Sequence, residues 1–241
     1  MNDAVFVENQ YQFLDGMELS REMPKSAQVY EILRGAIIDM KLRPGVPINK
    51  ELISTKLKVS KTPVSEAVSR LEENGLLEVF PQHGTFVPKI RKSDVRQGAF
   101  LRKALEVAAA REVAEHVSGA QLDQLNKNLR YQESALAAGD LEDFHTRDEE
   151  FHTLICRFTG YPRLPRLVDG SRGQLDRVRK LLLPDPNRPA ETIKEHKQIL
   201  DAIKRRDPDA AASAMKNHLD KVPARLEQLV LQQPEMFEVA N

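Results

Sequence analysis

The sequence predicts a mostly α-helical protein in two parts, a small N-terminal part that carries one hairpin and a C-terminal all-α helical bundle. Apolar residues recur at helical spacing from about Ser26 onward, which is the pattern of amphipathic helices. One segment, from Leu76 to Val87, instead reads as strand, turn and strand. After Ser93 no further convincing strand occurs, and six helical segments without strands imply a bundle.

The composition is that of an ordinary globular protein. The chain has 241 residues, of which 41% are hydrophobic and 30% charged, enough for one large domain or two modest ones. No run of about 18 apolar residues exists, which excludes a membrane span. The first 23 residues lack the basic start and apolar segment of a secretory signal, and the one cysteine, Cys156, cannot form an internal disulfide and is expected in the core. These features predict a cytoplasmic protein.

The net charge of zero hides an asymmetry between the two parts. Residues 25–92 hold 12 Lys or Arg against 7 Asp or Glu, whereas the remainder holds 24 against 29. A basic segment beside an acidic one is typical of a DNA-binding module joined to a domain of another kind, although many proteins that bind no DNA show a similar imbalance.

The N-terminal part is expected to contain three helices within residues 25–89, after a flexible tail at residues 1–24. The first helix begins near Ser26 and ends before Pro44-Gly45, because proline cannot continue a helix and glycine permits a turn. A second helix follows at about 50–57. The third begins at Ser60-Lys61-Thr62-Pro63, where hydroxyls can cap free amides, and Asn74-Gly75 ends it.

The C-terminal part is expected at residues 94–232, after a linker at 90–93 and before a short tail at 233–241. Ser93 or Asp94 caps its first helix. The later helices are expected at 120–138, 140–159, 163–183, 190–206 and 207–231. Glycine and proline groups mark the boundaries of these helices, at Gly119, Gly139-Asp140, Gly160-Tyr161-Pro162, Pro184-Asp185-Pro186 and Asp207-Pro208.

The third helix has a polar face that fits the major groove of B-DNA. The side chains that avoid its apolar stripe are Lys61, Thr62, Ser65, Glu66, Ser69 and Arg70. Nearby basic residues are candidates for phosphate contacts, which set register but not sequence: Arg34, Arg43, Lys50, Lys56 and Lys58. Gly84, at the tip of the hairpin, allows a tight turn close to the duplex. The alternative is a small helical fold whose basic face is merely solvated.

Four stretches of this part closely resemble the winged helix-turn-helix of GntR-type bacterial transcription regulators. They are Leu42-Arg43-Pro44-Gly45, the run from Val59 to Ala67, the run from Leu71 to Leu76, and His83-Gly84-Thr85-Phe86-Val87. The resemblance covers about Gln28 to Val87. It implies that the third helix reads DNA and that the hairpin is the wing.

The chain departs from the family pattern at two positions. Ser65 stands where the family usually has an arginine that reads a guanine, and His83 stands where an arginine usually precedes the wing glycine. Serine can donate or accept at a base edge but cannot make a bidentate guanine contact. The departures therefore bear on the operator sequence rather than on DNA binding itself.

The helical part holds a candidate metal site. Three of the six histidines, His152, His196 and His218, lie in helical patterns with apolar neighbours, and Asp148 precedes His152 by four residues on one helix face. One carboxylate and three imidazoles from three helices suit Zn²⁺, Ni²⁺ or Mn²⁺. Spacing alone leaves open that the histidines are core or surface residues and that Asp148 and His152 form a plain ion pair. The other histidines fall outside the set, and His116 and His145 are expected to be solvated helix residues.

Motifs around these residues resemble the FCD ligand-binding domain of the FadR branch of the family, over about Asp94 to Leu229. The resemblance implies six or seven helices around a cavity and an organic acid as effector. Its metal-dependent members use an Asp and three His, which correspond to Asp148, His152, His196 and His218. Arg102 resembles the family arginine near that cavity and could bind the acid, although it could equally pair with Glu106 four residues on.

We therefore expect a transcription regulator, with repression as the more usual arrangement in the family. Its winged domain binds a near-palindromic operator as a homodimer. Its helical domain binds a divalent metal, zinc first and nickel or manganese as alternatives, and a small carboxylate-bearing metabolite. Two rivals stay open, namely a metal-dependent hydrolase and a regulator whose histidines contact the effector without a metal.

Overall fold

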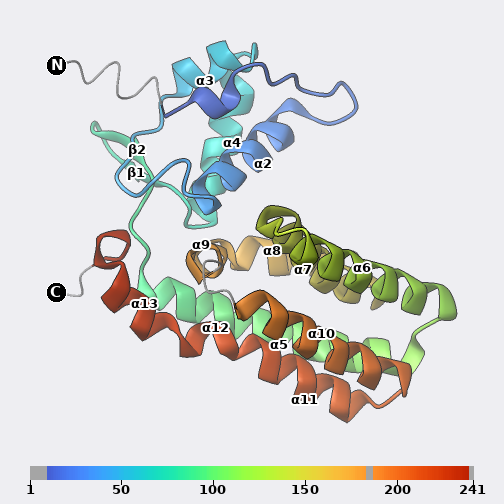
Figure 1. Ribbon diagram of the computed structural model, residues 1–241. Helices are drawn as coiled ribbons and strands as arrows, with labels where there is room; N and C mark the ends of the chain where they lie inside the picture. Colours follow the sequence, from blue (N-terminus) through green and yellow to red (C-terminus); the bar gives the residue numbers. More distant parts are fainter. Residues whose placement is uncertain (1–9, 183–186, 239–241) are drawn as a thin grey trace. The chain divides into compact units, whose positions relative to one another are not determined.

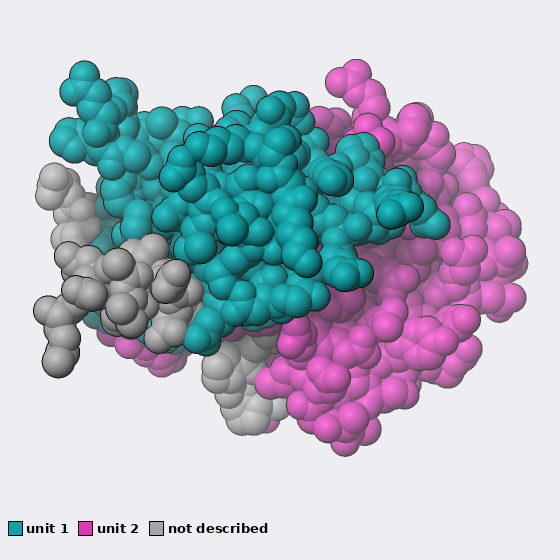
Figure 2. All heavy atoms as spheres, turned by 90° about the horizontal axis from the view of Figure 1, so that it is seen from above, with its two compact units in different colours: residues 1–94, 233–241 teal, residues 95–232 magenta. Residues whose placement is uncertain are grey.

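A computed structural model describes residues 10–182 and 187–238, and it divides the chain into two compact units (Figure 1). Unit 1 comprises residues 1–94 and 233–241, and unit 2 comprises residues 95–232; Figure 2 colours them separately. The chain therefore crosses between the units twice. In the part of the chain that the structure describes, no helix is both long and apolar enough to span a bilayer.

Unit 1 is a winged helix-turn-helix. Helix α2 (Lys25–Ile38) packs on α4 (Lys61–Glu73), and the short α3 (Lys50–Lys56) leads into α4 through a tight turn. Asn49 caps α3, because its side chain accepts a hydrogen bond from the amide of Leu52 at 2.9 Å. The core of this unit includes Leu33, Ile37, Ile53, Val64 and Leu71.

The wing is an antiparallel hairpin of β1 (Glu78–Phe80) and β2 (Gly84–Phe86), which confirms the expected strand, turn and strand. Gln82 and Gly84 adopt positive φ angles of 65° and 110° in and after the turn. The segment before α3 pairs with the wing as a third extended segment. Ile48 N donates to Thr85 O at 2.8 Å, and Gly45 N donates to Val87 O at 2.8 Å. The sequence patterns did not predict this pairing.

Both expected tails differ from the prediction where the structure describes them. Residues 10–24 include the turn η1 (Gln12–Leu14), whose Leu14 is buried, and the Tyr11 hydroxyl donates to Pro47 O at 2.8 Å. At the other end, η2 (Pro234–Met236) precedes Phe237, which forms a parallel bridge with Ile90. Single aromatic anchors carry too little periodicity to be read as structure. Residues 1–9 and 239–241 of the expected tails lie outside the described residues.

Unit 2 is a bundle of helices, and its described residues contain no strand. The helix α5 (Lys92–His116), the longest in the described chain, leads into α6 (Gly119–Ala137) and α7 (Leu141–Phe158), and α10 (Arg188–Lys204) pairs with α11 (Pro208–Leu219) (Figure 1). Three helix starts of unit 2 are capped by side chains. Ser118 forms a capping box with Gln121, and Asp140 and Asp207 accept from backbone amides three residues on. The cap expected for α5 is wrong, because α5 begins at Lys92 and Ser93 and Asp94 lie within its first turn. In unit 1, Ser60 at the start of α4 likewise makes no side-chain cap bond.

Two of the expected helices are interrupted. The segment expected as one helix at 163–183 forms α8 (Leu164–Ser171) and α9 (Gly173–Leu182), separated at Arg172. The segment expected at 207–231 forms α11, α12 (Lys221–Ala224) and α13 (Leu226–Gln232). Pro223 explains the break between α11 and α12, because proline lacks the N–H that would bond Leu219 O. The expected boundary at Pro184-Asp185-Pro186 lies outside the described residues.

Candidate functional site

The polar face of helix α4 is exposed as the sequence predicts. Its apolar side chains Val64, Ala67, Val68 and Leu71 are buried in unit 1. The exposed residues on the other side are Lys61, Thr62, Ser65, Glu66, Ser69 and Arg70. His83 and Gly84 are exposed at the tip of the wing. Unit 1 therefore presents a polar helix and a hairpin tip without any rearrangement of its core.

Contacts within unit 1 orient two of the basic side chains on α4. The Arg70 guanidinium lies 4.2 Å from the centroid of the Tyr30 ring, a cation–π contact. Lys61 Nζ lies 2.5 Å from Glu51 Oε1, although both side chains are largely exposed. Because an exposed ion pair contributes little, Lys61 can exchange Glu51 for a phosphate at small cost.

One of the residues expected to meet phosphates is buried. Arg34 lies on α2 with only 7% of its surface exposed, whereas a phosphate contact needs an accessible guanidinium. Periodicity placed it beside the apolar residues of α2, but a long aliphatic stem allows arginine to be buried. Arg43 is exposed and Lys50 is half-buried, so both stay candidates.

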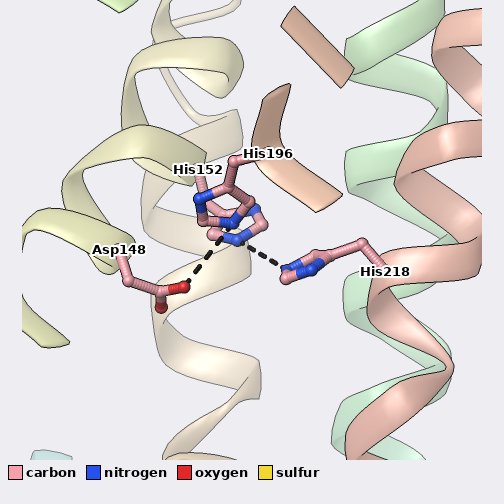
Figure 3. A group of neighbouring side chains, drawn as sticks. All are labelled: Asp148, His152, His196 and His218. Carbon is pink, nitrogen blue, oxygen red and sulfur yellow. Dashed lines mark hydrogen bonds and ion pairs between the residues drawn. The ribbon is translucent and has the colours of Figure 1, made fainter. Parts of the chain in front are cut away.

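Helices α7, α10 and α11 bring Asp148, His152, His196 and His218 together, which we call the candidate metal cluster (Figure 3). One ligand atom from each side chain lies within 4.8 Å of every other, and all four residues are buried. His152 Nε2 lies 3.1 Å from His218 Nε2, and His196 Nε2 lies 3.6 Å from Asp148 Oδ1. Donors at roughly 2.0–2.1 Å from a tetrahedral ion are ~3.3 Å apart, so these two separations bracket that spacing.

Each member of the cluster also contacts a side chain outside it. His152 Nδ1 lies 2.6 Å from Glu106 Oε2, and His218 Nδ1 lies 2.6 Å from Glu195 Oε2. His196 Nδ1 lies 2.9 Å from Gln132 Oε1, and its ring stacks on Phe151. Asp148 Oδ2 is held by Arg179. Metal-binding histidines typically have such a partner on the second ring nitrogen.

The electrostatics suit a cation at this point. Burial lowers the pKa values of His196 and His218 well below the usual value, and the other histidines of the cluster add to that effect. Burial also lowers the pKa of His152, although Glu106 opposes the shift. The imidazoles are therefore neutral at pH 7, the form that binds metals. His196 Nε2 is buried without a hydrogen-bond partner, so the donor set fits a divalent ion placed among these atoms.

Burial alone would raise the pKa of Glu106, but the charge of Arg102 and the contact with His152 hold it well below its usual range. Glu106 therefore stays ionised. An anionic acceptor behind His152 favours its Nδ1–H tautomer and leaves Nε2 free to coordinate.

A cavity adjoins the candidate metal cluster. Its polar lining includes Asp148, His218 and three arginines, Arg102, Arg179 and Arg188. Its apolar lining includes Phe144, Leu175, Leu182, Pro189, Leu219 and Val222. The cavity therefore places cationic groups and an apolar wall beside the cluster.

Both roles considered for Arg102 have support in the structure. Its Nε donates to Glu106 Oε1 at 2.5 Å, which is the expected pair with the residue four positions on. Its Nη2 atom, however, is buried and has no hydrogen-bond partner. A buried guanidinium N–H without a partner is unusual, and the cavity that Arg102 lines is where an acceptor could bind.

Histidines outside the cluster behave differently from one another. His116 is exposed, as expected. His145 was expected in solvent but is buried beside the cavity, and burial, with Arg179 nearby, lowers its pKa to about 3. His145 lies three residues before Asp148, on the same face of α7. Residues of α9 such as Arg179 cover that face, and the sequence did not indicate this contact between the two helices.

The sequence patterns missed the partners around the cluster. Glu106 was expected only as a partner of Arg102, and Glu195, which directly precedes His196, was given no role. Gln132 and Arg188 carried no signal, because a polar residue on a helix is ordinarily solvated. Three arginines at and within α9, namely Arg172, Arg177 and Arg179, are all buried.

A winged helix-turn-helix joined to an all-helical bundle is the architecture of a DNA-binding regulator. Comparison with known proteins agrees. Residues 25–87 match the bacterial regulatory proteins of the gntR family, and residues 99–221 match the FCD domain. The chain therefore belongs to the gntR family, in its FadR-like FCD branch.

The relatives are transcriptional regulators. The HTH-type transcriptional repressor RspR of Escherichia coli (strain K12) is 33% identical over 220 residues, which cover 91% of this chain and 96% of that protein. The Nta operon transcriptional regulator of Aminobacter aminovorans is 27% identical over 74% of this chain and 83% of its own. The protein is thus a DNA-binding transcriptional regulator rather than an enzyme, which removes the hydrolase alternative.

Solved structures support the fold. Escherichia coli McbR/YncC superposes with a TM-score of 0.75 at 22% identity, covering 87% of this chain and 99% of that one. A GntR transcriptional regulator from Rhodococcus sp. RHA1 gives a TM-score of 0.70 at 23% identity, covering 85% and 98%. At such identities the likeness concerns the architecture alone.

Proposed function

We propose that this regulator binds its operator as a homodimer and that a small carboxylate-bearing metabolite, bound at a divalent metal in the helical domain, controls that binding. The observation that carries the proposal is the candidate metal cluster, in which four donor atoms converge while outer partners occupy their other polar atoms. When bound, the metal supplies a Lewis-acidic centre that attracts carboxylate oxygens.

Zinc is the proposed ion, with nickel and manganese as alternatives. Three imidazole nitrogens and one carboxylate oxygen form a nitrogen-rich set, which zinc and nickel favour, whereas manganese prefers more oxygen donors. Asp148, His152, His196 and His218 would hold the ion. An effector acid would lie in the adjoining cavity, where the free Nη2 of Arg102 can donate to it.

We infer repression relieved by the effector, because the relative from Escherichia coli is a repressor. The effector must bind the DNA-competent and the DNA-incompetent states with different affinities, since equal binding would shift nothing. A homodimer would place two α4 helices on two half-sites of one operator, so that the operator is near-palindromic.

The test begins with metal analysis of protein purified without a nickel column. One divalent ion per chain is expected, and removal by chelator should lower the midpoint of thermal unfolding, because an ion that binds only the folded state stabilises it. A thermal-shift screen of organic acids should then find an acid that stabilises the metal-loaded protein more than the chelated one. An acid that stabilises both forms equally would favour the rival in which the histidines bind the effector without metal.

A further inference from the structure

The three histidines of the candidate metal cluster differ in the groups behind them. Carboxylates lie behind His152 and His218, and an ionised carboxylate can only accept a hydrogen bond. The group behind His196 is the amide of Gln132, which can present either its oxygen or its NH₂. Gln132 alone therefore does not decide which ring nitrogen of His196 carries the proton. The choice matters, because only a ring protonated at Nδ1 leaves Nε2 free toward Asp148 and the other histidines.

A chain of hydrogen bonds from the surface of α7 determines that choice. Asn128 Nδ2 donates to Glu150 Oε2 at 3.1 Å, so the Asn128 oxygen must face the other way. Gln132 Nε2 donates to that oxygen at 2.8 Å and lies 3.4 Å from the backbone oxygen of Arg147. Both of these neighbours are acceptors only. The Gln132 oxygen is thus left for His196, whose Nδ1 must carry the proton.

The reversed arrangement is disfavoured at every step. If Gln132 turned its NH₂ toward His196, its oxygen would face the oxygen of Asn128 and the carbonyl of Arg147. If Asn128 turned as well, its oxygen would face the Glu150 carboxylate, which Arg147 Nη1 holds at 3.2 Å. Gln132 is 0% exposed and Asn128 3% exposed, so water cannot relieve either clash.

We propose that Gln132 is a positioning residue that fixes the Nδ1–H tautomer of His196, and that Asn128 and Glu150 fix the orientation of Gln132. Helix α6 thereby prepares a ligand that α10 carries, without contacting the bound ion itself. The consequence for metal affinity depends on the proposed function, whereas the tautomer does not. The two can therefore fail separately.

The direct test is the ring ¹⁵N spectrum of His196 in chelator-treated protein. The native chain should show His196 protonated at Nδ1. Gln132→Met removes the acceptor at similar size and should shift the ring toward the Nε2–H form. Glu150→Gln should give a mixture of both tautomers, because the new amide allows every hydrogen bond from residue 150 to His196 to reverse its direction. Gln132→Glu keeps an acceptor and should restore the native tautomer. Gln124→Met, an exposed glutamine on the same helix, is the matched control.

The second measurement is Co²⁺ affinity by competition with a chromogenic chelator. Gln132→Met should weaken binding about 10–100-fold, as expected for loss of a partner behind a ligand, and Gln132→Glu should stay within a few-fold of the native chain. If Gln132→Met does not fold, Glu150→Gln and Gln132→Glu carry the test. A native His196 protonated at Nε2, or a tautomer that no variant moves, would overturn the proposal. A native chain that binds no Co²⁺ would instead remove the metal from the proposed function.

Discussion

Burial decides what single residues can do in this protein. Arg34 and His145 both read from the sequence as solvent-facing, yet both are buried, one in each unit. Conversely, the three histidines of the candidate metal cluster are useful as ligands because burial keeps them neutral. The same burial makes Cys156 inert, although a single cysteine in a regulator invites a redox interpretation.

Cys156 should not react in the folded protein. It is buried on α7, and burial, with a smaller contribution from Glu106, raises the pKa of its thiol to about 12. Since the thiolate is the nucleophile, alkylation by iodoacetamide at pH 8 should be negligible until the protein is unfolded in guanidinium, where one thiol per chain should react. Rapid labelling of the folded chain would show that α7 opens or that the thiol is accessible.

His196→Ala should lower metal content while leaving operator affinity nearly unchanged. The residue is 0% exposed and lies far from α4 in the sequence, in the other unit. Loss of one of four donors should reduce Zn²⁺ occupancy by about tenfold or more at limiting metal. Removal of a partner behind a ligand already lowers metal affinity about 10–100-fold, and loss of the ligand itself should do at least as much. Elemental analysis measures this, with His116→Ala, an exposed histidine of the same unit, as the control. Full occupancy in His196→Ala would refute the ligand set.

At the scale of elements, the two units use their helices for different purposes. In unit 1 the helix α4 buries one face and leaves the other free for an outside partner. In unit 2 the helices α7, α10 and α11 turn polar side chains inward, where α5, α6 and α9 supply the partners. Most polar groups of this interior are paired with one another, which limits the cost of burying them, and the exceptions include His196 Nε2 and Arg102 Nη2.

Arg70→Ala and Lys61→Ala should each weaken operator binding. Loss of a base contact by Arg70 would cost about 1–3 kcal/mol, and loss of a phosphate contact by Lys61 would reduce the salt dependence by about one charge. Gel-shift titrations at several salt concentrations measure both effects. Lys204→Ala, an exposed lysine of unit 2, is the control. If neither variant differs from the control, α4 is not the recognition helix.

Gly98→Ala should destabilise the packing of α5. A Cβ atom at Gly98 would lie 2.7 Å from the backbone oxygen of Ser171, a contact that only a shift of the α8–α9 junction can relieve. Overpacking of this kind typically costs about 1–3 kcal/mol. Gly119→Ala, where nothing lies within 4 Å, should be neutral or slightly stabilising. The midpoints of thermal unfolding of the two variants measure this difference, and the Gly98→Ala midpoint should be the lower one. Equal midpoints would show that the α8–α9 junction moves freely.

The sequence predicts the elements better than their interruptions and contacts. The helix starts follow from Ser118, Asp140 and Asp207, because capping is a local interaction that a few neighbouring residues determine. The end of α11 has a local cause of the same kind in Pro223. The break at Arg172 lies between Gly170 and Gly173, so the glycine signal for it was present, but the apolar periodicity continues through both glycines. Partners such as Gln132 depend on which helices face each other, and periodicity gives only the apolar side.

At the scale of the whole molecule, the chain connects its two units twice, once after Asp94 and once before Gln233. The returning segment is anchored in unit 1, where Ile90 N donates to Met236 O at 2.9 Å and Arg91 Nε to Glu238 at 2.7 Å. Helix α11, which carries His218, continues through α12 and α13 into that segment. Changes at the cluster therefore have two covalent routes to the DNA-binding unit.

The central claim is that a metal-bound acid in unit 2 controls DNA binding by unit 1. The test needs a labelled operator, which the protein selects from a random duplex library. The acid with the largest thermal shift is titrated into zinc-loaded and into chelated protein, and fluorescence anisotropy measures how much operator stays bound. We predict that the acid weakens operator binding at least tenfold, about 1.4 kcal/mol, in the zinc-loaded protein alone. An equal response of both forms, or none in either, would contradict the account.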